Sequence, residues 1–118
     1  HIEETNLNRQ VIAFRRTVGE SKVDASIREL RGIAQDFELH AYSEGITEEN
    51  ADDFVDQCDL IVDEIDVYPL EAHIHLHRAA RKKKIPVYSA FSVGMGVRFF
   101  KFEGDSYTFE DFLAASPE

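Results

Sequence analysis

An alternation of strand-like and helical segments along the chain predicts an α/β fold with a mostly parallel sheet. Two short apolar runs, at residues 60–62 and 85–88, have strand character, and a helical segment at residues 69–84 separates them. Strands joined through helices of this length indicate crossover connections between parallel neighbours. The chain of 118 residues has the common size of one domain, so we expect a single domain over residues 1–118.

The first third of the chain is expected to begin with the tail of a strand at residues 1–4 and to continue with a polar turn and short helix at residues 6–14. Residues 21–34 predict a helix because apolar residues recur there at helical spacing, namely Val23, Ile27, Leu30 and Ile33. Ser21 is placed to cap that helix. A short strand is expected at residues 37–43.

The rest of the chain continues the alternation. The expected elements are, in order, a helix from Thr47, a strand at 60–62, a helix at 69–84, strands at 85–88 and 97–102, and a helix at 107–115. Thr108 is placed to cap the last helix. Gly94 and Gly96 lie between the last two strands, so they indicate a turn between strands and not a phosphate-binding loop.

The composition limits the classes of function. A formal charge of −10 argues against binding to nucleic acid, which requires a basic surface. The sequence has no run of eighteen apolar residues that could span a membrane, and its start lacks the pattern of a secretory signal. Cys58 is the only cysteine, which excludes an internal disulfide, so we expect a cytoplasmic protein.

A polar cluster stands near the start of the chain, where Asn6, Arg9 and Gln10 fall within five residues and Lys22 follows. A guanidinium binds phosphate through a two-pronged contact, and an ammonium adds a second positive charge. The cluster therefore suits a nucleotide triphosphate. The alternative is structural: an Asn that caps a helix and an Arg in a surface salt bridge.

The segment Glu-Thr-Asn-Leu-Asn-Arg-Gln at residues 4–10, followed by Gly-Glu-Ser-Lys at residues 19–22, resembles the signature of the ThiF/MoeB adenylyltransferases, relatives of the ubiquitin-activating enzymes. The resemblance implies a Rossmann-like three-layer fold that binds ATP. It implies that Asn6 and Arg9 contact the ATP phosphates, that Gln10 helps to position them, and that Lys22 stabilises charge as pyrophosphate leaves.

Members of this family carry a Gly-rich strand–turn–helix unit ahead of the motif, and no such unit stands before Asn6. The resemblance thus implies a domain truncated at its N-terminus, through fragment design or proteolysis, or alternatively through natural loss. Backbone N–H groups of the Gly-rich turn normally hold phosphates. We therefore expect these 118 residues alone to bind ATP poorly.

Two carboxylates, Asp63 and Asp66, follow the strand at residues 60–62, at the sheet edge where α/β proteins bind ligands. Carboxylates there suit Mg²⁺. The segment Val-Asp-Glu-Ile-Asp resembles a family motif, which implies that Asp66 is the metal-linked residue; the alternative is a solvated acidic loop. Val67 and Glu71 depart from the family pattern, which has Asn and often Arg at these places.

Other polar groups receive structural interpretations. His73 and His77 share one helix face while His75 points away, and no Cys or carboxylate partner is evident, so we interpret them as an amphipathic or pH-responsive surface. The basic run at residues 78–84 complements the end of a helix. Cys58 is expected to be a buried residue without thioester chemistry, and a lone Cys cannot supply the family's paired-cysteine zinc site, so no zinc is expected.

The resemblance implies an ATP- and Mg²⁺-dependent adenylyltransferase domain that activates a carboxylate, such as the C-terminus of a ubiquitin-like or sulfur-carrier protein. It also implies a homodimer. Unpaired edges at residues 37–43 and 60–63 favour a dimer or strand-exchanged assembly, or alternatively a direct pairing of these two strands with each other. The rival hypothesis is a truncated or degenerate interaction module without catalysis. A nicotinamide- or flavin-binding domain is disfavoured, because no dinucleotide fingerprint is present.

Overall fold

The computed structural model describes residues 1–66, 68–105 and 107–114. These residues fall into two compact units, His1–Ser43 and Glu44–Glu118, and each unit is described by itself. None of the helices in the described part of the chain is long and apolar enough to cross a membrane. A single domain over residues 1–118 stays a prediction.

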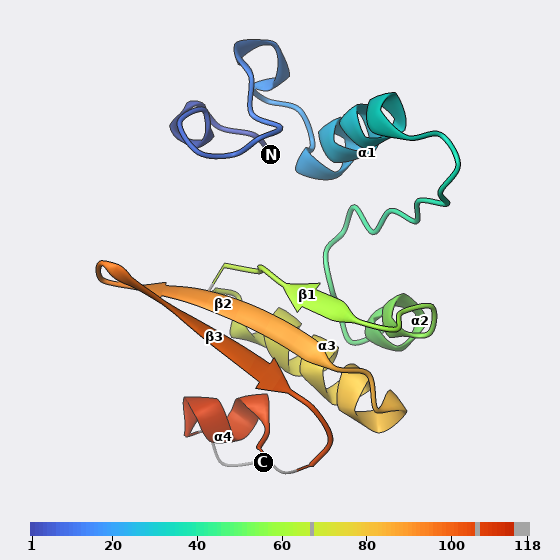
Figure 1. Ribbon diagram of the computed structural model, residues 1–118, viewed down its shortest axis with the longest axis vertical. Helices are drawn as coiled ribbons and strands as arrows, with labels where there is room; N and C mark the ends of the chain where they lie inside the picture. Colours follow the sequence, from blue (N-terminus) through green and yellow to red (C-terminus); the bar gives the residue numbers. More distant parts are fainter. Residues whose placement is uncertain (67, 106, 115–118) are drawn as a thin grey trace. The chain divides into compact units, whose positions relative to one another are not determined.

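The first unit contains two short 3₁₀ helices, η1 (Glu4–Asn6) and η2 (Arg15–Thr17), and one long helix, α1 (Lys22–Ile33) (Figure 1). The Ser21 hydroxyl accepts a hydrogen bond from the Asp24 N–H at 3.3 Å. This bond satisfies one of the donors that the start of a helix leaves unpaired. The expected helix and its cap are therefore confirmed.

Three expectations for the first unit are wrong. Residues 1–4 are not a strand tail, since η1 already begins at Glu4. Residues 6–14 form turns and not a helix, as in the bond from the Ala13 N–H to the Gln10 carbonyl at 2.9 Å. Residues 37–43 are not a strand, since they have no strand assignment and do not belong to the described three-stranded sheet.

The second unit is built on a three-stranded sheet with the order β1 (Ile61–Asp63), β2 (Val87–Val93), β3 (Gly96–Phe102). β1 and β2 are parallel, with Ile61 opposite Val87, and β2 and β3 are antiparallel. β1 overlaps the apolar run at residues 60–62, and β2 begins within the run at residues 85–88 and continues to Val93. The α/β class and the parallel pairing through a helical crossover are confirmed.

Three helices accompany this sheet: α2 (Ala51–Val55), α3 (Leu70–Lys83) and α4 (Phe109–Leu113). α4 begins as expected, because the Thr108 hydroxyl accepts a hydrogen bond from the Asp111 N–H at 3.1 Å. α2 begins four residues later than expected. Thr47 and Asn50 exchange side-chain to backbone hydrogen bonds and hold the chain in a turn ahead of the helix.

The turn at Gly94 joins β2 to β3 in a hairpin, which confirms the interpretation of these glycines as a turn between strands. Gly94 has φ +62°, in the left-handed region that a residue without a Cβ reaches most readily. The hairpin is tight, since Val93 lies opposite Gly96 in the ladder.

The core of the second unit lies on one face of the sheet, along which α3 runs (Figure 1). Its largest buried members come from strands and helices alike: Val55, Ile61, Leu76, Val87, Phe102 and Phe109. Burial alternates along β1, where Ile61 and Asp63 are buried and Val62 is exposed. The end of β1 therefore directs a carboxylate, Asp63, toward α3.

Candidate functional site

Backbone pairing joins the two halves of the N-terminal motif within the first unit. The Ile2 N–H donates to the Glu20 carbonyl at 2.9 Å, and the Gly19 N–H donates to the Ile2 carbonyl at 2.8 Å. A small buried cluster of Ile2, Ala13 and Ala25 reinforces this pairing. The turn that precedes Lys22 is thus fixed to the segment that precedes Asn6.

Asn6 is buried and has a structural role in the turn that precedes Arg9. Its side-chain oxygen accepts a hydrogen bond from the Glu3 N–H at 2.9 Å. Its carbonyl accepts hydrogen bonds from the backbone of Arg9 and Gln10 at 3.2 and 3.0 Å. Asn6 therefore caps the start of η1 from its third residue and shapes the loop that carries Arg9, and it is not the N-cap of a following helix.

Arg9 and Lys22 are the cations of the predicted site. Arg9 is exposed, and its guanidinium donates to the Thr5 carbonyl at 2.6 Å and to the Asn8 side-chain oxygen at 3.1 Å. Lys22 is half-buried at the first residue of α1. Within the described residues, neither cation forms an ion pair with a carboxylate. Their charges remain available to an anion.

Asp66, the predicted metal-linked residue, lies in the second unit, three residues beyond the end of β1, and is exposed. The structure therefore places Asn6, Arg9, Gln10 and Lys22 in one unit and Asp66 in the other. Glu71 is exposed in the first turn of α3. Val67 lies outside the described residues.

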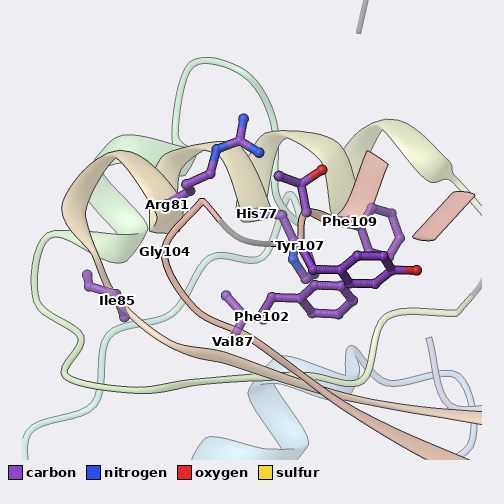
Figure 2. A pocket seen from close by; sticks show the side chains of 9 residues that line it. His77, Arg81, Ile85, Val87, Phe102, Gly104, Tyr107 and Phe109 are labelled. Carbon is purple, nitrogen blue, oxygen red and sulfur yellow. The ribbon is translucent and has the colours of Figure 1, made fainter. Parts of the chain in front are cut away.

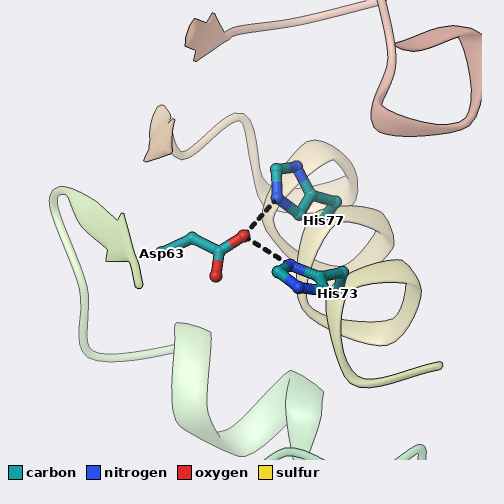
Figure 3. A group of neighbouring side chains, drawn as sticks. All are labelled: Asp63, His73 and His77. Atoms are coloured by element: carbon teal, nitrogen blue, oxygen red, sulfur yellow. Dashed lines mark hydrogen bonds and ion pairs between the residues drawn. The ribbon is translucent and has the colours of Figure 1, made fainter. Parts of the chain in front are cut away.

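A buried polar group lies between β1 and α3, formed by Asp63, His73 and His77 (Figure 3). Both histidines donate to the same oxygen, Asp63 Oδ2, from His73 Nδ1 at 2.8 Å and from His77 Nε2 at 2.9 Å. His73 is 0% exposed and His77 is 4% exposed. The shared helix face was predicted correctly, but the interpretation as a surface is wrong, because β1 supplies the carboxylate partner.

Asp63 accepts more hydrogen bonds than the two from histidine. The Ser89 hydroxyl donates to Oδ2 at 3.2 Å, and the Ile65 N–H donates to Oδ1 at 3.1 Å. Burial on its own raises the pKa of Asp63, but the hydrogen bonds from His77 and His73 outweigh burial and hold that pKa below its ordinary value. Asp63 is consequently a buried, ionised carboxylate at neutral pH.

Two imidazoles and a carboxylate are a donor set that suits a transition metal, and the three ligand atoms lie within 4.8 Å of one another. Each of these atoms also has a hydrogen-bond partner inside the group. The group is therefore complete as a hydrogen-bond network. The expectation of no zinc rests on the missing paired cysteines, and the histidines are set aside as metal ligands because no carboxylate partner is evident; Asp63 is such a partner.

Aromatic rings enclose the two histidines. The Phe109 ring stacks on both, with centroids 5.0 Å from His73 and 4.4 Å from His77. Figure 2 shows His77 beside Phe102, Tyr107 and Phe109 in the wall of a small pocket. This enclosure fixes the planes of both rings and separates them from water.

The basic residues at the end of α3 pair with carboxylates of their own unit. Arg78 contacts Glu110 at 2.7 Å, Lys82 contacts Asp52 at 2.8 Å, and Lys83 pairs with Asp56. Ion pairs between elements thus account for these charges, which agrees with the structural interpretation of the run.

Cys58 is half-buried, and its thiol lies 3.3 Å from the Phe54 carbonyl. Burial, together with the neighbouring charge of Asp59, raises the pKa of the thiol. A thiol with a raised pKa is a poor nucleophile at neutral pH. Cys58 is thus partly buried and not fully buried as expected, and its lack of thioester chemistry stays a prediction.

Comparisons with known proteins complete the description. A crystal structure of selenomethionine-labelled PaaA has a similar fold, with a TM-score of 0.72 at 20% sequence identity. The match covers 93% of this chain and 34% of the PaaA chain, so this chain spans about a third of that protein. No curated protein matches. The family model of the ThiF family matches residues 1–118, and the chain therefore belongs to the ThiF family.

Proposed function

We propose that this chain is the phosphate-handling part of an ATP-dependent adenylyltransferase. The observation that carries the proposal is the pair of cations, Arg9 and Lys22, which have no carboxylate partner in the described residues and belong to one small unit. The backbone bonds between Ile2 and the turn at Gly19 hold the two motif halves together. An uncompensated guanidinium and ammonium suit a polyphosphate.

The proposed reaction activates a carboxylate. A carboxylate oxygen attacks the α-phosphorus of ATP, a bond to that phosphorus forms, and the bond to the bridging oxygen of pyrophosphate breaks. Arg9 binds the phosphates, and Lys22 stabilises the negative charge that moves onto the departing pyrophosphate. The products are an acyl adenylate and pyrophosphate.

Asn6 and Gln10 position the phosphates in this proposal. The Asn6 oxygen already serves the turn, while no hydrogen bond of its amide nitrogen occurs within the described part of the chain. That nitrogen is the donor we assign to a phosphate oxygen. Asp66 is exposed at the carboxyl end of β1 and would hold Mg²⁺, which neutralises phosphate charge when bound.

We assign the C-terminus of a ubiquitin-like or sulfur-carrier protein as the carboxylate, and we propose a cytoplasmic homodimer as the working form. A second candidate is an interaction module without turnover. The observation that favours it is the outward sheet face, on which three large side chains, Val62, Tyr88 and Phe99, are exposed.

Pyrophosphate exchange into ATP tests the proposal. The intact protein, with any segments that precede His1 in its gene, is incubated with Mg-ATP, labelled pyrophosphate and candidate carboxylates. We expect exchange that requires the cognate acid and that Lys22→Ala strongly reduces. Arg31→Ala, which removes an exposed cation from the last turn of the same helix, is the matched control. Absence of exchange with every acid, together with absence of ATP binding, would favour the interaction module.

A further inference from the structure

His73 is buried, and each of its two ring nitrogens has a polar partner. Its Nδ1 faces the Asp63 carboxylate at 2.8 Å, and its Nε2 faces the Asp66 backbone carbonyl at 3.0 Å. A carboxylate and a carbonyl only accept hydrogen bonds. Both ring nitrogens of His73 therefore face acceptors, one in the buried network and one at the residue with the proposed metal role.

Asp63 and His73 together hold the backbone on both sides of the segment that carries Asp66. Asp63 Oδ1 accepts from the Ile65 N–H at 3.1 Å, and His73 holds the Asp66 carbonyl. Asp63 and His73 are almost fully buried, whereas Asp66 is exposed. A rigid buried pair thus fixes the main chain of an otherwise solvent-facing carboxylate.

The orientation of the His73 ring is itself fixed. Phe109 stacks on it with a centroid distance of 5.0 Å and an angle of 18° between the planes. Because the ring plane cannot turn freely, Nε2 stays directed at the Asp66 carbonyl. Substitution of a residue that orients a metal ligand typically lowers metal affinity or activity 10–100-fold.

We propose that His73 is a positioning residue that sets the Asp66 carboxylate for a divalent cation through the bond from Nε2 to the Asp66 carbonyl. The inference rests on the proposed role of Asp66. It differs from a packing role, which requires only the bond between His73 and Asp63.

Two substitutions separate the two bonds. In His73→Asn, the side-chain amide nitrogen lies near the position of Nδ1 and retains the bond to Asp63, but it cannot reach the Asp66 carbonyl. In His73→Gln, the amide nitrogen lies near the position of Nε2 and retains the bond to Asp66. His75→Gln is the control, since His75 lies off the face that His73 and His77 share.

The measurement is the affinity of the intact protein for Mn²⁺, followed by electron paramagnetic resonance in the presence of ATP; Mn²⁺ shares the oxygen ligands of Mg²⁺. We expect His73→Asn to weaken Mn²⁺ binding about tenfold. His73→Gln and His75→Gln should stay close to the unsubstituted protein. Circular dichroism checks that each variant is folded.

The carbonyl ¹³C shift of Asp66, measured by NMR, is the second readout, and it should move in His73→Asn but not in His73→Gln. Equal effects of both substitutions would overturn the positioning role in favour of packing. Stoichiometric zinc that either substitution removes would overturn it in favour of a metal centre at Asp63, His73 and His77. If the unsubstituted protein does not bind Mn²⁺, the proposed role of Asp66 fails, and the ¹³C shift still tests the contact.

Discussion

Asp63→Asn tests the buried network most severely, because one oxygen of Asp63 accepts three hydrogen bonds and the other accepts one. The substitution keeps the size of the side chain and removes its charge. The amide presents one acceptor and one donor, so at least one of the four donors around it loses its partner.

The magnitude follows from these four bonds. Hydrogen bonds to a charged acceptor contribute about 1.5–3 kcal/mol each, against about 0.5–1.5 kcal/mol for neutral ones, so the three bonds to Oδ2 lose roughly 1 kcal/mol each. An unpaired Ile65 N–H adds about 1–3 kcal/mol. Because neighbouring contributions are not additive, we expect a loss of about 3–5 kcal/mol, the range for breaking a buried charged pair.

Urea unfolding followed by far-UV circular dichroism measures this loss. Asp59→Asn is the matched control, because Asp59 is an exposed carboxylate just ahead of β1, and its loss should change stability by no more than about 0.5 kcal/mol. A loss below about 1 kcal/mol in Asp63→Asn, with an unchanged denaturant slope, would refute the idea that the network stabilises the second unit.

Two further predictions concern acid stability and ATP binding. Burial on its own would raise the pKa of the Glu110 carboxyl, but the hydrogen bond from Arg78 outweighs burial and holds the pKa below its ordinary value of about 4.3. The resulting stabilisation is present above this ordinary value and is lost as pH falls through the lowered pKa. Glu110→Gln should therefore destabilise the chain at pH 6, and in acid its unfolding midpoint should approach that of the unsubstituted protein. A difference between the two midpoints that stays constant with pH would contradict this prediction. The 118 residues alone should bind ATP weakly, and submicromolar binding in a calorimetric titration would contradict that expectation.

Local patterns in the sequence were sufficient for most elements of the fold. Ser21 and Thr108 mark the starts of α1 and α4 because a hydroxyl can pair with a free backbone donor at those places. Apolar runs mark β1 and β2. Residues 37–43 show the limit of this reasoning: their alternating apolar residues suit a strand, but this segment does not belong to the described sheet.

The buried network was missed because it depends on a contact between β1 and α3. The sequence nevertheless contained a signal. His73 and His77 fall in the same helical stripe as Leu76 and Ala80, which are buried. Asp63 lies two residues after Ile61 and therefore faces the same side of the strand. Polar residues at core positions of two adjacent elements indicate a buried pair.

The roles of Arg9 and Lys22 in phosphate binding are the central claim, and calorimetric titration of Mg-ATP into the intact protein tests them most directly. Arg9→Ala removes charge-assisted contacts that contribute about 1.5–3 kcal/mol each, so we expect ATP to bind about ten- to a hundredfold more weakly. Arg15→Ala, which removes an exposed cation of the same unit, should leave the affinity unchanged. Unchanged ATP affinity and unchanged adenylation in Arg9→Ala would contradict the claim.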